Sequence, residues 1–276
     1  MVPLGKQREL LIETSEREAV LSVADTAKCI MRSFIHVGTG VALNGGSAHA
    51  QRLPPRARLR FAVEGTAPGI TSLRFEEQSP LHVTTTQLIS VKPPRIVRFR
   101  FVFLSDPVHA SVRDKIETRI LMNHVSLIFG QQANLILQEA AAPLDVFIPR
   151  DLGNPIRTSN DALLHLIEFE SRAAFQGVDF VVFGVWDVES KRGTTGTLGL
   201  GTLFPARNRL YAFIEVSRSG FAVQAHVLAH EIGHVLGLAH VAKRPGLMFP
   251  TIDVLSNRLF AGDIEVVNPP SDGLLP

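Results

Sequence analysis

One short segment of the sequence, HVLAHEIGHVLGLAH (residues 226–240), places four histidines and a glutamate among apolar residues. On a helix, residues four apart share a face, so His230 and His234 can direct their imidazole nitrogens at one point. Zinc binds such nitrogens at about 2.0–2.1 Å. Gly237 can end the helix with a left-handed residue, which lets His240 return as a third ligand. Three nitrogen ligands and one open position are typical of catalytic zinc.

Glu231 follows the first of these ligands directly, where it can reach a metal-activated water without binding the metal. The alternative is an apolar core helix with satisfied histidines, which is the usual interpretation of a single residue such as His226. Three histidines and a glutamate buried without a metal would leave several polar groups to desolvate. The pattern therefore predicts one catalytic zinc ion, bound by His230, His234 and His240, with Glu231 as the general base.

The elements that carry this segment differ between the two halves of the chain. Residues 1–92 contain short alternating runs of apolar and polar residues separated by Gly, Pro and Ser, which predicts a small β-sandwich domain. The stretch TAKCIMRSFI (26–35) fits a helix as an alternative. The paired prolines of KPPR (92–95) break both helix and ladder, so they predict a domain boundary.

Residues 93–276 alternate between strand-like and helix-like segments, and we expect them to form a second domain. Strands are predicted over 95–104, 133–140, 178–188, 202–205 and 209–216, and the nearly apolar 178–188 should be covered on both faces. A helix is predicted over 111–131, with apolar residues at helical spacing that place Val112, Ile116, Ile120, Leu127 and Ile128 on or near one face. Another should begin after Ser159 or Asn160 as its N-cap. The expected fold class is therefore α+β.

The motif HEIGHVLGLAH, followed by Met248 in GLMFP, resembles the zinc signature and Met-turn of the metzincin metalloproteases. The spacing from His240 to Met248 is similar to that of the matrix metalloproteases (matrixins). The resemblance is strong over residues 223–250 and does not cover residues 1–92. It implies a twisted mixed sheet with an active-site helix, one catalytic zinc and hydrolysis of peptide bonds in protein or peptide substrates.

The resemblance also implies where a substrate binds. An extended peptide would lie along an edge strand near Gly199, Leu200 and Gly201, whose glycines also fit an ordinary flexible loop. Pro250, after the Met-turn, would help wall the S1′ pocket, and His226 would limit its depth. For His226, a buried core role is the alternative. An apolar S1′ pocket whose depth is limited by the His226 ring predicts an apolar P1′ residue of intermediate size, such as Leu, Ile or Met.

The sequence also departs from the matrixin pattern. The region before the fifth strand (191–216) has no histidine, so we expect no second zinc ion. Phe249 replaces the tyrosine that some metzincins use as an extra ligand. Cys29, the single cysteine, does not sit in a cysteine-switch segment and rules out an internal disulfide.

Composition narrows the partners. A net charge of +2, from 28 basic and 26 acidic side chains, argues against nucleic acid as the main partner. The start of the sequence has no apolar signal region, so we expect a cytoplasmic protein or export without a cleaved signal. Two alternatives to a general endopeptidase remain. One is a narrow-specificity protease effector that uses residues 1–92 for delivery or docking. The other is a non-catalytic binding protein on a metzincin scaffold.

Overall fold

The computed structural model describes most of the chain. The described residues are 2–3, 7–14, 19–24, 27, 29–37, 50–67, 69–77, 84–189, 199–204, 209–216, 220–242, 245–251 and 257–269. They divide into two compact units, one built from Met1–Pro94 and the other from Arg95–Gln131 and Leu135–Pro269, with Gln132–Asn134 counted in the first. No helix in these described ranges is both long and apolar enough to span a membrane.

The first unit consists of two β-sheets. A five-stranded sheet has the order β1-β8-β7-β3-β5, and a three-stranded sheet has the order β2-β6-β4. The bounds are β1 Val2–Pro3, β2 Gln7–Glu13, β3 Ala19–Val23, β4 Cys29–His36, β5 Ala50–Leu53, β6 Arg58–Gly65, β7 Gly69–Glu77 and β8 Thr84–Lys92. All pairings are antiparallel except that of β1 with β8. The helical alternative for residues 26–35 is wrong, because Cys29–His36 pairs with β6 along its length.

The two sheets share one apolar cluster. Leu21 and Leu73 come from the five-stranded sheet, whereas Met31 and Phe61 come from the three-stranded one. In β6 the buried residues Leu59, Phe61 and Val63 alternate with more exposed positions at its start, as a half-buried strand requires. Burial of this cluster gives the first unit a hydrophobic core of its own.

The second unit is a mixed α/β structure around one sheet. The sheet order is β10-β9-β13-β16-β15, and β11 also pairs with β9. The strands are β9 Arg95–Ser105, β10 Leu135–Glu139, β11 Leu144–Phe147, β13 Phe180–Val185, β15 Gly199–Phe204 and β16 Arg209–Glu215. Only β15 runs antiparallel to its neighbour, with Gly199 opposite Ile214 and Phe204 opposite Arg209. The two short strands β12 (Ile156–Arg157) and β14 (Val188–Glu189) form a separate pair that the sequence did not reveal.

The central strand β13 is buried at every position, which confirms the expected burial on both faces. One face of the sheet packs against α2 (Asp161–Glu170) and the 3₁₀ helix η2 (Arg172–Phe175), in a cluster that includes Val102, Phe183 and Leu163. The N-cap of α2 is Asn160, whose side chain accepts a hydrogen bond from the Leu163 amide. Of the two predicted caps, Asn160 is therefore the correct one.

The helix predicted over 111–131 begins later and buries a different face. A 3₁₀ turn, η1 (Arg113–Lys115), and an extended Ile116 come first, and α1 spans Thr118–Ala133. Of the predicted face, Ile120 and Leu127 are exposed, whereas the buried residues are Leu121, Met122, Val125, Phe129 and Ala133. Both faces of α1 carry large apolar residues. The predicted periodicity was counted from residue 111, before the helix begins, and therefore indicated the exposed face.

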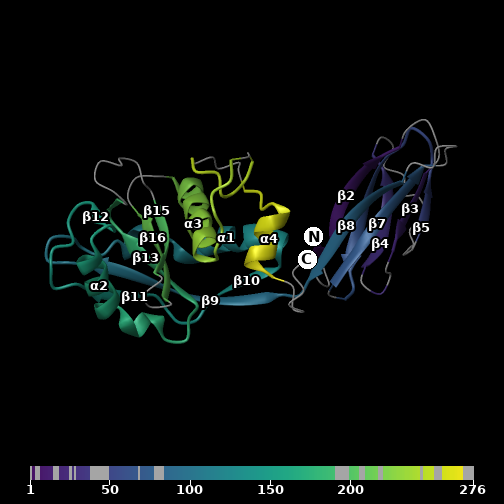
Figure 1. Cartoon of the computed structure of the whole chain (residues 1–276). Helices are drawn as coiled ribbons and strands as arrows, with labels where there is room; N and C mark the ends of the chain where they lie inside the picture. Colours follow the sequence, from purple (N-terminus) through teal and green to yellow (C-terminus); the bar gives the residue numbers. More distant parts are fainter. Residues whose placement is uncertain are drawn as a thin grey trace. The chain divides into compact units, whose positions relative to one another are not determined.

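The last two helices complete the second unit. Helix α3 (Phe221–Val235) lies against β15 and β16, as Figure 1 shows, and α4 is Ala261–Val267. The His124 ring of α1 meets the Phe221 ring of α3 edge-on at 5.0 Å, so these two helices are neighbours. Helix α3 brings the histidine segment to the side of the sheet where β15 forms the edge of the described part.

Candidate metal centre

Helix α3 ends where the sequence predicts. Gly237 has φ of +96°, in the left-handed region that glycine adopts without a Cβ clash. Its amide donates to the His234 carbonyl, and the Leu238 amide donates to the Gly233 carbonyl, both at 2.9 Å. This pair of hydrogen bonds is a Schellman motif, which satisfies the last carbonyls of the helix and reverses the chain. The reversal brings His240 back towards α3.

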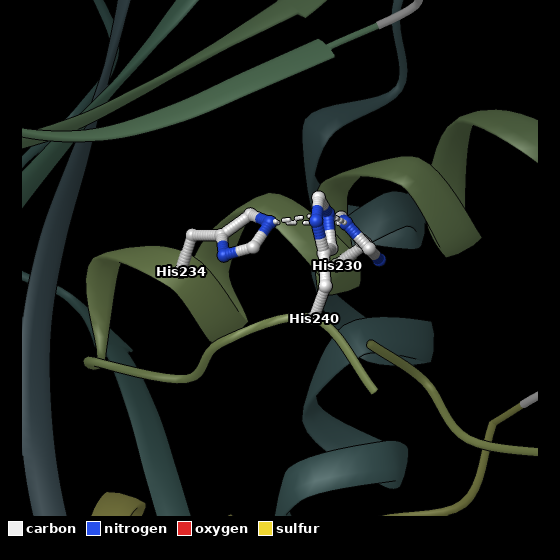
Figure 2. Close-up of side chains that lie close together, drawn as sticks. All are labelled: His230, His234 and His240. Atoms are coloured by element: carbon white, nitrogen blue, oxygen red, sulfur yellow. Dashed lines mark hydrogen bonds between the residues drawn. The ribbon is translucent and has the colours of Figure 1, made fainter. Parts of the chain in front are cut away.

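The three histidines named from the sequence meet at one point (Figure 2). The Nε2 atom of His230 lies 3.1 Å from that of His234 and 3.2 Å from that of His240, and the remaining pair is 3.1 Å apart. These nitrogens form a nearly equilateral triangle whose centre lies about 1.8 Å from each, slightly less than a zinc–nitrogen bond of about 2.0–2.1 Å. A zinc ion just outside the triangle plane would therefore reach all three.

Backbone carbonyls fix the orientation of two of these rings. The Nδ1 atom of His230 lies 2.8 Å from the Leu247 carbonyl oxygen, and that of His234 lies 2.8 Å from the Leu238 carbonyl oxygen. A carbonyl only accepts hydrogen bonds, so each Nδ1 carries the proton and each Nε2 presents a lone pair. Metal-binding histidines have this arrangement, in which the second ring nitrogen donates to a carbonyl or carboxylate.

These tautomers exclude a hydrogen bond between the Nε2 atoms of His230 and His234. Two neutral rings protonated on Nδ1 cannot share a hydrogen bond through Nε2, because neither Nε2 has a proton to donate. Burial lowers the pKa of His230 to about 4 and also lowers the pKa of His234, so the charged form that would supply a proton is disfavoured. Two acceptors 3.1 Å apart need a cation between them. The site therefore fits a metal ion by its donor set as well as by its dimensions.

Glu231 and Met248, which lie close to the three histidines in the sequence, are both buried. Glu231 is 8% exposed and follows His230 on α3, and Met248 is fully buried. A Cβ atom added to Gly233 would lie 2.5 Å from the Met248 sulfur, so the methionine packs directly against the helix one residue before His234. The Met248 carbonyl also accepts from the Val241 amide at 2.9 Å, which ties the segment to the one that carries His240.

The predicted substrate-binding residues occupy two separate elements. Gly199, Leu200 and Gly201 begin β15, which pairs with β16 on one side only within the described residues. Pro250 is exposed and follows Phe249 after the Met248 segment. Whether these positions bind a substrate remains a prediction.

His226 is 4% exposed, and its Nδ1 atom lies 3.1 Å from the side-chain oxygen of Asn257. Sequence reasoning missed this partner, as it missed the carbonyls of Leu247 and Leu238. Backbone atoms leave no mark in a sequence, and Asn257 stands in SNRLF without any motif around it.

A second group of potential ligands occurs in the described residues. Oxygen or nitrogen atoms of Asp106, His109 and Asp151 lie within 4.8 Å of one another. The Asp106 carboxylate, however, already accepts from the amides of Val108, His109 and Leu152 at 2.6–2.8 Å, and His109 Nδ1 lies 3.0 Å away. Burial alone would raise the pKa of Asp106, but these donors lower it overall. A carboxylate with its lone pairs occupied in this way is a structural bridge between loops.

Comparisons with known proteins agree with this geometry. Residues 183–268 match the matrixin family model, about a third of the chain, from β13 to the end of α4. No curated protein sequence matches. Over this segment, which contains the three histidines, the chain is similar to the matrixin metallopeptidases.

Several solved structures also overlap with the chain. Archaemetzincin from Methanopyrus kandleri is 16% identical, covers 62% of this chain and 93% of its own, and has a TM-score of 0.41. Metalloproteinase-II from Bacteroides fragilis is 14% identical, with 75% and 80% covered and a TM-score of 0.41. A zinc-dependent peptidase from Methanocorpusculum labreanum is 16% identical, with 62% and 98% covered and a TM-score of 0.38.

Proposed function

We propose that this chain is a zinc-dependent endopeptidase. The observation that carries the proposal is the triangle of Nε2 lone pairs, with two of its three rings fixed by carbonyls so that they can only accept. Such a centre in a segment of metzincin type supports hydrolysis of peptide bonds in protein or peptide substrates. One zinc ion per chain would occupy it.

His230, His234 and His240 would hold the metal, and Glu231 would be the general base. When bound, zinc supplies Lewis acidity, which lowers the pKa of water towards neutrality and polarises a substrate carbonyl. Glu231 takes a proton from the attacking water and passes it to the leaving amine. Its position directly after the ligand His230 on α3 supports this role.

The substrate would lie extended along β15, with its backbone hydrogen-bonded to the strand. Gly199 and Gly201 would permit close approach of a second chain, with Leu200 between them. Pro250 would help wall an S1′ pocket that prefers Leu, Ile or Met. Each methylene that fits contributes about 0.8 kcal/mol, so the preference would be graded rather than absolute.

Two structural assignments belong to the same proposal. The turn around Met248 would be a Met-turn, which the packing of its sulfur against Gly233 supports. The first unit would be a β-sandwich accessory domain, which the shared core of its two sheets supports.

The decisive experiment compares the wild-type chain with Glu231→Ala in a proteome-wide map of cleavage sites, together with elemental analysis of dialysed protein. Glu231→Ala should keep one zinc ion per chain and lose activity by several orders of magnitude, because it removes the base and no ligand. Glu117→Ala, an exposed glutamate before α1, is the matched control and should retain full activity. Residual activity of a few per cent in Glu231→Ala would contradict the role of Glu231, and an inactive wild type would favour a non-catalytic binding protein.

A narrow-specificity protease is the second candidate, and the separate core of the first unit favours it. A domain that folds around its own core can serve as a docking module for one target. Cleavage of a single protein in a whole-cell lysate, with no activity on denatured casein or gelatin, would select this function over a general endopeptidase.

A further inference from the structure

Backbone hydrogen bonds join the chain just before Met248 to Arg258. The Leu247 amide donates to the Arg258 carbonyl at 2.8 Å, and the Arg258 amide donates to the Pro245 carbonyl at 3.2 Å. Gly246 and Arg258 thereby form a parallel bridge. Asn257, whose side chain lies beside His226, directly precedes Arg258 and is therefore next to this bridge.

Two histidines of α3, one turn apart, bind the two ends of the segment between Leu247 and Asn257. His230 donates from Nδ1 to the Leu247 carbonyl at 2.8 Å, at the start. His226 lies with its Nδ1 3.1 Å from the Asn257 side-chain oxygen, at the end. Residues four apart on a helix share a face, so both hydrogen bonds arise from one side of α3. His226 is nearly fully buried and Asn257 is half-buried, so their hydrogen bond is partly shielded from water.

We propose that His226 is a positioning residue. His226 holds Asn257 against the active-site helix. The hydrogen bond between the Leu247 amide and the Arg258 carbonyl extends this restraint to Leu247. The Leu247 carbonyl in turn holds the His230 ring in the orientation that presents Nε2 to the metal. His226 therefore acts on the metal centre without binding the metal.

The same restraint has a consequence for selectivity, which rests on the proposed function. Pro250 lies within the restrained segment. If this segment walls the S1′ pocket, His226 sets the pocket by holding the wall in place and not by filling the space with its ring. Removing Asn257, which is half-buried, should then change selectivity as much as removing the His226 hydrogen bond does.

The experiment uses the full-length zinc-loaded chain with four variants. His226→Phe keeps a planar aromatic ring and loses Nδ1, whereas Asn257→Leu keeps the number and branching of the side-chain heavy atoms and loses the acceptor. Asn257→Asp retains an acceptor and should behave as the wild type. His165→Ala, an exposed histidine of α2, is the matched control. Peptide-resolved hydrogen exchange reports on the amides of residues 247 and 258, and transfer of zinc to a chelator reports on the metal centre.

His226→Phe and Asn257→Leu should both accelerate exchange at residues 247 and 258 by about tenfold and release zinc several times faster. Wild-type exchange in both variants would overturn the proposal, and if His226→Phe does not fold, Asn257→Leu alone decides. The peptide-library profile should broaden at P1′ in both variants. A profile that shifts only in His226→Phe, or in neither, would overturn the role in selectivity. Exchange and zinc release remain measurable if the wild type cleaves no peptide. Failure of the proposed function can therefore be told apart from failure of the positioning role.

Discussion

Replacement of Gly233 by alanine tests the packing on which the metal centre rests. The added Cβ would lie 2.5 Å from the Met248 sulfur and 3.2 Å from its terminal methyl, whereas ordinary contacts are about 3.5–4.0 Å. Met248 is fully buried, so its sulfur cannot move by about 1 Å without displacing its neighbours. Overpacking of this kind costs about 1–3 kcal/mol. Alanine recovers about 0.5–1 kcal/mol because glycine is a poor helix residue, which leaves a net loss between about 0 and 2.5 kcal/mol.

The assay is equilibrium urea unfolding with EDTA present, because bound zinc would add stability by mass action. The chain has one tryptophan, Trp186, which lies in the second unit, so its fluorescence reports on that unit alone. The control is Gly130→Ala in α1, where the nearest atom to an added Cβ is 3.5 Å away. That substitution should be neutral or stabilising.

A double-mutant cycle with Met248→Ala sharpens the test. Shortening Met248 removes the clash, so Gly233→Ala should change sign in that background and stabilise by about 0.5–1 kcal/mol. A Gly233→Ala variant that is more stable than the wild type would refute the packing, as would an equal cost in both backgrounds.

Four further outcomes are expected. Gly237→Ala should lower the free energy of unfolding by about 1–2 kcal/mol because φ is +96°, and a change below about 0.5 kcal/mol would contradict this. The metal-free protein should lose stability as pH falls from about 6.5 to about 4, because unfolding releases His230 from a pKa of about 4 to its ordinary value and the unfolded chain then binds more protons. A flat urea midpoint over that window would argue against a buried neutral His230. Residues 95–276 should fold without the first unit, and an insoluble fragment from a soluble chain would show that the halves depend on each other. Elemental analysis should give one zinc ion per chain, and two tightly bound ions would make Asp106, with its neighbours, a second site.

The sequence was most informative where one residue type allows one conformation or one chemistry. The spacing of His230, His234 and His240 predicted their convergence, and Gly237 predicted the end of α3. Strands β9, β10, β13, β15 and β16 of the second unit were also predicted, because their alternation or continuous apolar character differs from the helical period. Of the predicted strands, 178–188 proved the most clearly buried, as its composition indicated.

Prediction failed where several residues compete for the same role. Helix α1 offers two apolar faces, and only packing against the rest of the unit selects Leu121 and Val125 over Ile120 and Leu127. The short strands β11, β12 and β14 are held by neighbours distant in sequence, so local pattern does not reveal them. The hydrogen bonds that orient the ligands are equally non-local, since Leu247 lies seventeen positions from His230.

The metal centre and the turn around Met248 therefore form one unit. His230 depends on the Leu247 carbonyl, and His234 depends on the Leu238 carbonyl that the Schellman motif delivers. Both carbonyls belong to segments that follow α3, so the helix alone could carry its histidines without fixing their rings. The lowered pKa values of His230 and His234 keep both rings neutral. Each neutral ring already donates its proton to a carbonyl, so the two rings form no hydrogen bond with each other. Packing around Met248 supplies part of the free energy that gathers them, and a zinc ion bound as proposed would supply the rest. Metal affinity should therefore depend on the packing of the segments that carry Leu238 and Leu247.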